Sequence, residues 1–304
     1  RKPDDVHRDG LGGGVMAEVG SRHGRHWDVA GPELVEEYDR VLAGRAPSHG
    51  AAGQRVAPRR RAASVTGRRA RRQAAPVRDE TGRIHVDLHV HTAYSEDSAS
   101  SVTSVLRTAA EVGLGAIAIA DHNTIAGALI ARRLAPDDLF VIVAEEIKTK
   151  QGEVIGLFVE EEIPAGLDLD ETLGLIKAQG ALVYVPHPFD GLHSTPSYRL
   201  LADNVHRIDA LEVFNARLAV PAFNVRAERF AAKYNIAAGA GSDAHVVQGL
   251  GTAMVRMEPF STPEEFLESL RDADILAARK SVLYLTSLKV LQTSLDRVRP
   301  LATR

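Results

Sequence analysis

The sequence contains no cysteine, which excludes disulfide bonds and thiolate metal ligands. A metal site in this chain would therefore use histidine and carboxylate ligands. The sequence also lacks any run of about 18 apolar residues, so no membrane-spanning helix is predicted. No apolar segment of the signal-peptide type follows the arginine-rich stretches. We expect a soluble, cytoplasmic protein without a membrane partner.

Charge is divided unevenly along the chain. Residues 1–83 contain 17 Lys+Arg and 11 Asp+Glu, a net charge of +6, whereas the remainder contains 20 and 29, a net charge of −9. Residues 46–78 carry nine arginines and no acidic residue, a composition typical of disordered chain. We predict a mostly disordered basic extension over residues 1–83. Its arginines could touch nucleic acid through phosphates, but no aromatic side chain is interleaved to stack on bases, which favours a solvated tail.

From Ile84 onward, short apolar segments alternate with amphipathic ones. Most apolar segments are continuous, which is typical of strands covered on both faces in a parallel α/β sheet. About seven strand–helix units over residues 84–280 predict a compact, irregular barrel. Residues 281–304 are predicted to form a C-terminal helix and tail. The predicted strands span residues 84–90, 116–120, 139–144, 154–159, 181–185, 210–214, 236–240 and 252–257.

Two histidines, His89 and His91, stand two residues apart at the end of the first predicted strand. Side chains alternate along a strand, so both imidazoles point to the same side. Imidazole is the commonest protein ligand of zinc-like metals, but one His-x-His pair alone is weak evidence. Metal-competent residues also end four further predicted strands, namely Asp121, His122, Glu145, Glu146, His187, Asp243 and His245.

The carboxyl ends of parallel strands meet at one rim of a barrel, so these side chains are expected to converge. Many histidines and carboxylates in a small volume would repel or lose hydration unless cations held them together. Nitrogen and oxygen ligands without thiolate suit zinc, manganese or iron. Because more than four ligands are present, the sequence predicts two or three divalent metal ions.

Five motifs in this order resemble the PHP family, named for polymerase and histidinol phosphatase. They are Asp87–Thr92, Ala120–Thr124, Glu146–Thr149, Val185–Pro188 and Gly241–His245. The resemblance covers about residues 84–280. It implies a distorted (β/α)7 TIM-like barrel, up to three divalent metal ions at its mouth, and phosphoester hydrolysis.

The resemblance also implies a set of metal ligands. Seven positions match directly: His89, His91, His122, Glu146, His187, Asp243 and His245. An aspartate ligand usually follows the first motif; both Glu96 and Asp97 are available, and we favour Asp97. Relatives often place a histidine before the Gly-Leu-Phe of the fourth strand, where this chain has Glu153, which can still bind metal.

The reaction that follows is hydrolysis of a phosphate monoester or nucleotide by a metal-bound hydroxide, on a small phosphorylated substrate. Asp121 or His187 would protonate the leaving alcohol. Arg217, just after the 210–214 strand, could hold the substrate phosphate, and a surface role is about equally compatible. Three alternatives stay open: a nuclease of the same fold that uses the basic extension, an amidohydrolase-type C–N hydrolase, and a non-catalytic metal-stabilised binding module.

Overall fold

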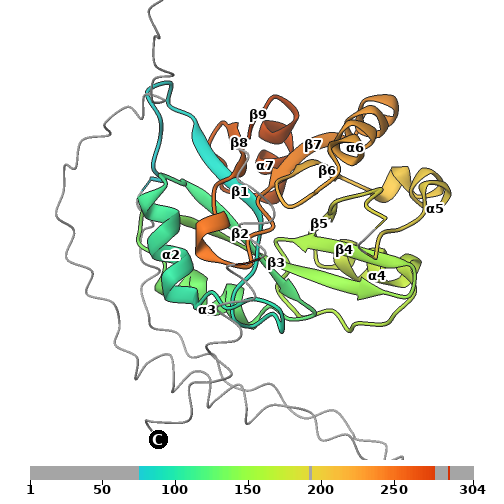
Figure 1. The fold of residues 1–304 in the computed structure, drawn as a ribbon, viewed down its shortest axis with the longest axis horizontal. Helices are drawn as coiled ribbons and strands as arrows, with labels where there is room; N and C mark the ends of the chain where they lie inside the picture. The colour runs from blue at the N-terminus through green and yellow to red at the C-terminus, as the bar shows by residue number, and fades with distance from the viewer. Residues whose placement is uncertain (1–74, 192–193, 278–286, 288–304) are drawn as a thin grey trace, which may run out of the picture.

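The strands form one nine-stranded sheet in the order β7-β6-β5-β4-β3-β2-β1-β8-β9 (Figure 1). The computed structural model describes residues 75–191, 194–277 and Ser287, and all statements below concern these residues. The sheet curls until its β7 end meets β1, where the Asp243 N–H donates to the His89 carbonyl at 2.8 Å and Val90 pairs with Ala244. The nearly closed sheet confirms the distorted α/β barrel expected from the sequence.

Most predicted elements are present within a few residues of their expected bounds. The strands are β1 (Ile84–Val90), β2 (Ala116–His122), β3 (Phe140–Thr149), β4 (Gly152–Leu157), β5 (Leu182–Val185), β6 (Ala210–Asn215), β7 (Ala237–Gly241), β8 (Ala253–Met257) and β9 (Asp274–Ala277). The helices are α2 (Val102–Glu111), α3 (Ala126–Leu134), α4 (Leu169–Ala178), α5 (Tyr198–Asp203), α6 (Pro221–Tyr234) and α7 (Pro263–Arg271). The sequence reasoning missed α5 and β9, which are short and mostly exposed and so carry little apolar periodicity.

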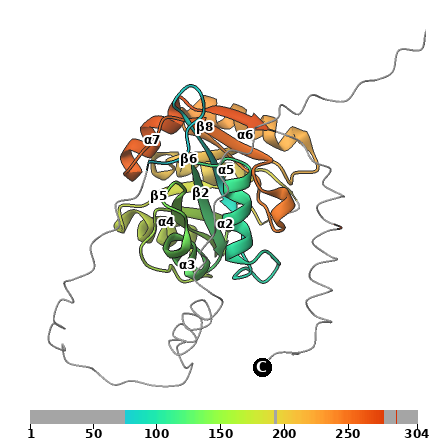
Figure 2. The same cartoon turned by 90° about the vertical axis from the view of Figure 1, so that its left-hand side faces the viewer.

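Two hydrophobic clusters lie on the two faces of the sheet. The inner one fills the barrel with side chains such as Leu88, Ile142 and Tyr184 and also includes α7, whereas the outer one packs the helices α2 to α6 against the strands. Helix α2 shows how the outer layer forms: Ser101 caps it by accepting from the Ser104 N–H, and its apolar residues Val102, Val105, Leu106 and Ala109 form one buried stripe. Figure 2 shows α2, α3 and α4 lying outside the strands.

Strand β4 runs antiparallel to its neighbours, which corrects the expectation of a parallel sheet. It pairs antiparallel with both β3 and β5. The cause is the short connection between β3 and β4, since only Lys150 and Gln151 separate them. A parallel crossover needs a dozen residues or more, whereas two residues make a hairpin.

A bulge in β1 changes which way its histidines point. Two residues, Leu88 and His89, separate the β1 positions paired with Ile117 and Ile119, but only one residue separates those on β2. The strict alternation expected from the sequence therefore breaks, and Val90 joins the outer cluster while Leu88 stays in the inner one. The extra residue turns His89 and His91 toward the barrel interior.

The described chain packs on the barrel before β1 begins. The Val77 N–H donates to the Asp138 carbonyl at 3.0 Å, and Arg83 pairs with Glu258 and Asp274.

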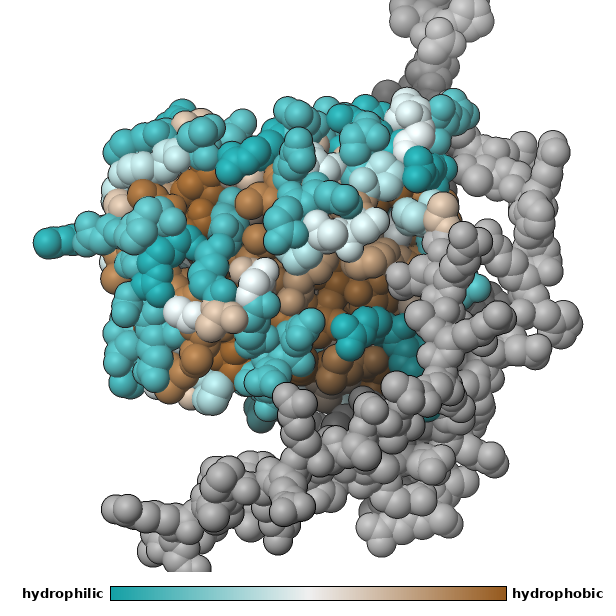
Figure 3. All heavy atoms as spheres, turned by 180° about the vertical axis from the view of Figure 1, so that it is seen from behind, coloured by the Kyte–Doolittle hydropathy of each residue, from teal (hydrophilic) through white to brown (hydrophobic). Residues whose placement is uncertain are grey.

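Apolar side chains gather in a band across the middle of the face seen in Figure 3, with polar side chains around it. In the described ranges, no helix has the length and apolar character needed to cross a membrane. Most of the predicted extension over 1–83 and nearly all of 281–304 lie outside the described residues.

Candidate metal centre

Eight of the nine predicted ligands, all except Glu153, come together at one rim of the barrel, as the sequence led us to expect. His89 and His91 lie at the end of β1, His122 ends β2, and His187 follows β5. Asp243 and His245 follow β7. Glu146 differs from the expectation of a strand end, because β3 continues to Thr149 through its pairing with β4.

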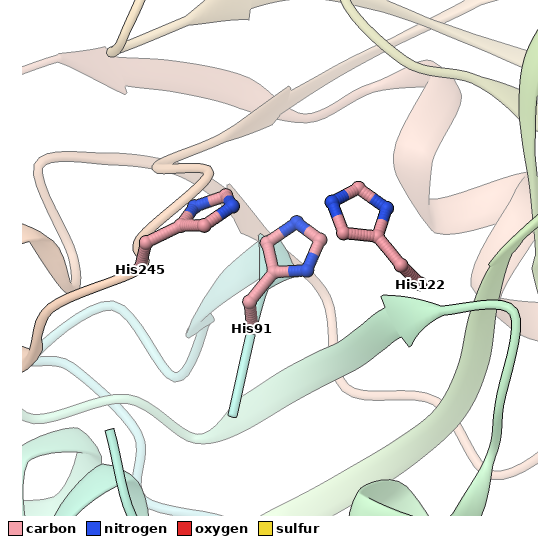
Figure 4. A group of neighbouring side chains, drawn as sticks. All are labelled: His91, His122 and His245. Carbon is pink, nitrogen blue, oxygen red and sulfur yellow. The ribbon is translucent and has the colours of Figure 1, made fainter. Parts of the chain in front are cut away.

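Three groups of side chains each place one ligand atom per residue within 4.8 Å of one another. They are His91, His122 and His245; His89, His91 and Asp243; and His89, Glu146 and His187. His89 and His91 each belong to two groups, so the groups are contiguous. Figure 4 shows the rings of the first group turned toward one another. This arrangement suits more than one cation held by shared ligands.

Glu146 lies at the middle of the centre. Its Oε2 is 3.1 Å from His122 Nδ1 and 3.4 Å from His89 Nε2, and its Oε1 is 3.1 Å from His187 Nε2. The two oxygens therefore face different histidines of the cluster, so Glu146 would be available to hold metal on either side. Neighbouring Glu145 points to the other face, where it accepts the Ile163 N–H at 2.9 Å. The geometry agrees with the choice of Glu146 over Glu145.

The loop after β1 brings Asp97 to the centre. Its Oδ2 is 2.8 Å from His245 Nε2, and its Oδ1 is 3.5 Å from His122 Nε2. Glu96, the alternative that the sequence left open, is exposed. The structure thus places Asp97 beside two of the other predicted ligands.

A hydrogen-bond chain fixes the orientation of His91. Ser95 Oγ donates its single proton to Asp121 Oδ1 at 2.8 Å and accepts the His122 N–H at 3.1 Å. His91 Nδ1 lies 3.0 Å from the same oxygen and must therefore be the donor. The Nε2 of His91 is left with its lone pair directed into the centre, as a metal ligand requires.

Asp121 lies beneath the centre and is fully buried. Its oxygens also accept the Thr92 N–H and the Thr92 hydroxyl, both at 2.6 Å. Burial raises the pKa of Asp121 against these hydrogen bonds, which lower it. The side chain thus supports Thr92 and, through Ser95, His91.

Glu212 on β6 was missed by the sequence reasoning. Its Oε1 lies 3.2 Å from His89 Nδ1, and its Oε2 accepts the His187 N–H at 2.7 Å. The sequence did contain an indication of its role, because Glu212 is the one charged residue in a strand that is otherwise uncharged and mostly buried. A carboxylate buried there needs partners, and it finds them behind two ligands.

The electrostatic potential of the centre favours cations. Burial would lower the pKa of His89, but the carboxylates of Asp243, Glu146 and Glu212 outweigh burial and raise it well above its usual value. Burial and the charge of His245 instead lower the pKa of His91 to about 3. The pocket thus favours a positive charge at His89, whose Nε2 lies 3.0 Å from the Nε2 of His91. A divalent ion held by these two nitrogens would supply that positive charge in place of the proton.

Arg217 reaches the centre from the loop after β6. Its Nη1 donates to Asp243 Oδ1 at 2.9 Å and lies 2.8 Å from His245 Nδ1. Burial of the guanidinium would lower the pKa of Arg217, but the nearby carboxylate of Asp243 outweighs this effect and raises the pKa. The sequence allowed either a phosphate-binding or a surface role, and these contacts favour a place in the site.

Backbone strain marks the same region. His187 and Asp243 have φ values of 27° and 51°, in the left-handed region that side chains other than glycine rarely adopt. Such residues cost about 1–3 kcal/mol each and persist where surrounding structure holds them. Here the strained turns aim both ligands inward.

Glu153 stands apart from the three ligand groups. It lies on β4 opposite Lys148, and its backbone N–H donates to the Ser194 carbonyl at 2.8 Å. Lys148 and Glu153 form a cross-strand pair that lies two residues beyond Glu146 along β3. The role of Glu153 as a metal ligand stays a prediction.

The fold and this centre define an α/β barrel with a histidine- and carboxylate-lined metal site at its mouth. The chain matches the PHP domain over residues 87–182 and the PHP-associated region over 221–275. An uncharacterized protein of Methanocaldococcus jannaschii is 35% identical over 213 residues, which cover 66% of this chain and 85% of the relative. The chain therefore belongs to the PHP family.

Solved structures with the same fold are more distant in sequence. PsfC from Pseudomonas syringae is 18% identical with a TM-score of 0.56, over 70% of this chain and 99% of PsfC. A two-domain protein from Bacteroides vulgatus, described as containing a predicted PHP-like metal-dependent phosphoesterase, is 18% identical with a TM-score of 0.52, over 70% of each chain. At this identity the likeness concerns the fold alone.

Proposed function

We propose that this chain hydrolyses a phosphate monoester of a small molecule, with two or three divalent metal ions bound at the barrel mouth. The observation that carries the proposal is the contiguity of the three ligand groups through His89 and His91. Zinc, manganese and iron suit such nitrogen and oxygen donors.

The residues that would hold metal are those that converge at the rim. They are His89, His91, Asp97, His122, Glu146, His187, Asp243 and His245, with Glu153 as the predicted additional ligand. When bound, the ions supply a water of near-neutral pKa and neutralise phosphoryl charge. Ser95 and Glu212 keep the ligand nitrogens of His91 and His89 directed inward.

Arg217 is the side chain best placed to bind the substrate phosphoryl group. It is positively charged and partly exposed, and it already contacts an anionic oxygen of Asp243. A guanidinium can present two N–H donors to a phosphate at once.

In this proposal Asp121 positions His91, because its oxygens are engaged by Thr92 and Ser95. His187 acts as a ligand, since its Nε2 faces Glu146.

Metal analysis of the purified protein, followed by a screen of phosphorylated metabolites, tests the proposal. We expect bound divalent metal and phosphate release that a chelator abolishes. His89→Ala and Asp243→Ala should each reduce turnover at least about a hundredfold. The exposed surface variant Glu171→Gln is the matched control and should retain turnover.

Parallel assays separate the alternatives. Cleavage of polynucleotide with steep salt dependence would favour a nuclease, and cleavage of acyl amides would favour amidohydrolase chemistry. Bound metal without turnover of any substrate class would favour a binding module. Full turnover in His89→Ala would contradict the assignment.

A further inference from the structure

The β3–β4 hairpin extends the inner face of the barrel beyond the metal centre. Ile142 and Ala144 on β3 belong to the inner cluster, whereas Val143 and Ile147 belong to the outer one. The pairing of β3 with β4 runs without a shift to Thr149. The alternation therefore places Glu146, and then Lys148, on the inner face.

Lys148 is the next inward-facing position after the central ligand Glu146. Positions two apart on a strand are separated by about 6.7 Å. A lysine side chain spans about 6 Å from its Cα. A phosphate bound to metal ions that Glu146 and its histidine neighbours hold would therefore lie within reach of the Lys148 ammonium.

The backbone of Lys148 is fixed while its ammonium is available. The Lys148 N–H donates to Asn123 Oδ1 at 2.8 Å, and the Asn123 N–H donates to the Glu146 carbonyl at 2.9 Å. Lys148 is exposed and forms no ion pair with any residue in the described ranges. Lys150 on the same hairpin differs, because its ammonium pairs with Asp168 at 3.1 Å.

We propose that Lys148 binds the phosphoryl group of the substrate from the hairpin side of the mouth, while Arg217 binds it from the β6–β7 side. The inference rests on the proposed phosphoesterase function. Two cations on different walls of the mouth attract a dianion more strongly than a monoanion. Lys148 therefore favours a terminal phosphate monoester over a phosphate diester.

The test compares Lys148→Met with Lys150→Met in the metal-replete protein. Substrates are p-nitrophenyl phosphate and bis(p-nitrophenyl) phosphate, and inorganic phosphate is the competing ligand. We expect Lys148→Met to raise KM for the monoester about tenfold with a smaller change in kcat, and to affect the diester less. The monoester-to-diester ratio of kcat/KM should fall, Lys148→Arg should restore part of it, and Lys150→Met should match the wild type.

A direct binding measurement separates this inference from the function on which it rests. Calorimetric titration with inorganic phosphate should give about tenfold weaker binding to Lys148→Met than to Lys150→Met, at equal metal content. If the wild type hydrolyses neither ester, the proposed function fails and the phosphate titration alone decides the role of Lys148. Equal phosphate affinity in the two variants, or loss of bound metal in Lys148→Met, would overturn the inference.

Discussion

Glu212 holds His89 from behind the metal centre, with 3.2 Å between its Oε1 and the ring Nδ1. Its other oxygen accepts the His187 N–H at 2.7 Å and the Asn215 side-chain amide at 2.9 Å. Because an ionised carboxylate can only accept, the His89 Nδ1 carries the proton and Nε2 faces the centre. One buried carboxylate thus links two ligands that come from different strands.

Substitution of Glu212 should weaken metal binding without removing a ligand. The glutamine of Glu212→Gln retains the size of the side chain, but its NH2 group cannot accept a hydrogen bond in place of the second carboxylate oxygen. We expect a 10- to 100-fold loss of metal affinity, the usual effect of removing the partner of a ligand histidine. Competition with a chromophoric chelator measures it, and Glu228→Gln, on the exposed face of α6, is the control. Unchanged affinity in Glu212→Gln would mean that His89 is oriented by other contacts.

Asp121→Asn distinguishes a positioning residue from a proton donor. The amide disturbs the hydrogen bonds to Thr92 and Ser95 that support His91. We expect metal affinity and kcat to fall about tenfold, while the pH profile of kcat keeps its shape. Loss of one limb of that profile would instead identify Asp121 as the acid.

Glu153→Gln decides whether the sequence-predicted extra ligand binds metal. If Glu153 is a ligand, the variant should bind one ion fewer than the wild type, because an amide oxygen is a much weaker donor than a carboxylate. Metal analysis after equilibrium dialysis measures the stoichiometry. Glu162→Gln, at an exposed position, should keep the wild-type stoichiometry.

The sequence could predict the barrel and most of the side chains that converge at its rim, because both depend on local patterns. Apolar runs identified strands such as β2, and a metal-competent residue at the end of a run identified a side chain of the cluster, such as His122. The convergence of these ligands follows from the geometry of parallel strands, whose carboxyl ends share one rim. Periodicity and residue type were therefore enough to bring distant side chains to one place.

The sequence could not predict features that arise from pairing between strands. The bulge that turns His89 inward depends on the register of β1 against β2. The reversal of β4 depends on a connection whose length becomes clear only when the ends of β3 and β4 are known. Glu212 acts through His89, 123 residues away in sequence, so spacing along the chain gives no sign of the contact.

Gly241 allows β7 to approach β1 closely at the metal centre. A Cβ at this position would lie 2.4 Å from the His89 Cβ and 2.5 Å from Glu212 Oε1. Gly241→Ala should therefore displace both side chains, lower the unfolding free energy by about 1–3 kcal/mol and abolish tight metal binding. Gly166→Ala is an instructive comparison, since its added Cβ meets no atom within 4 Å and only its positive φ is strained. Normal metal content in Gly241→Ala would show that the rim tolerates displacement.

Glu145 should make stability depend on pH. Burial, with the charge of Glu162 adding to it, raises the pKa of Glu145 to about 8 against the effect of the Ile163 N–H. The ordinary value is 4.5, so the folded protein binds this proton more tightly than the unfolded chain. The contribution to stability is therefore full below about pH 4.5, falls as the pH rises to about 8, and levels off above.

Urea unfolding of the wild type and Glu145→Gln measures this contribution. The amide cannot ionise and can still accept the Ile163 N–H, so the variant lacks the pH-dependent loss. Between about pH 6 and pH 9, the wild type should lose roughly 2–3 kcal/mol relative to Glu145→Gln. Glu171→Gln, an exposed position on α4, should follow the wild type at both pH values. Parallel pH profiles for the wild type and Glu145→Gln would mean that the buried carboxyl group ionises near its ordinary value, and that burial on β3 costs the charged form little.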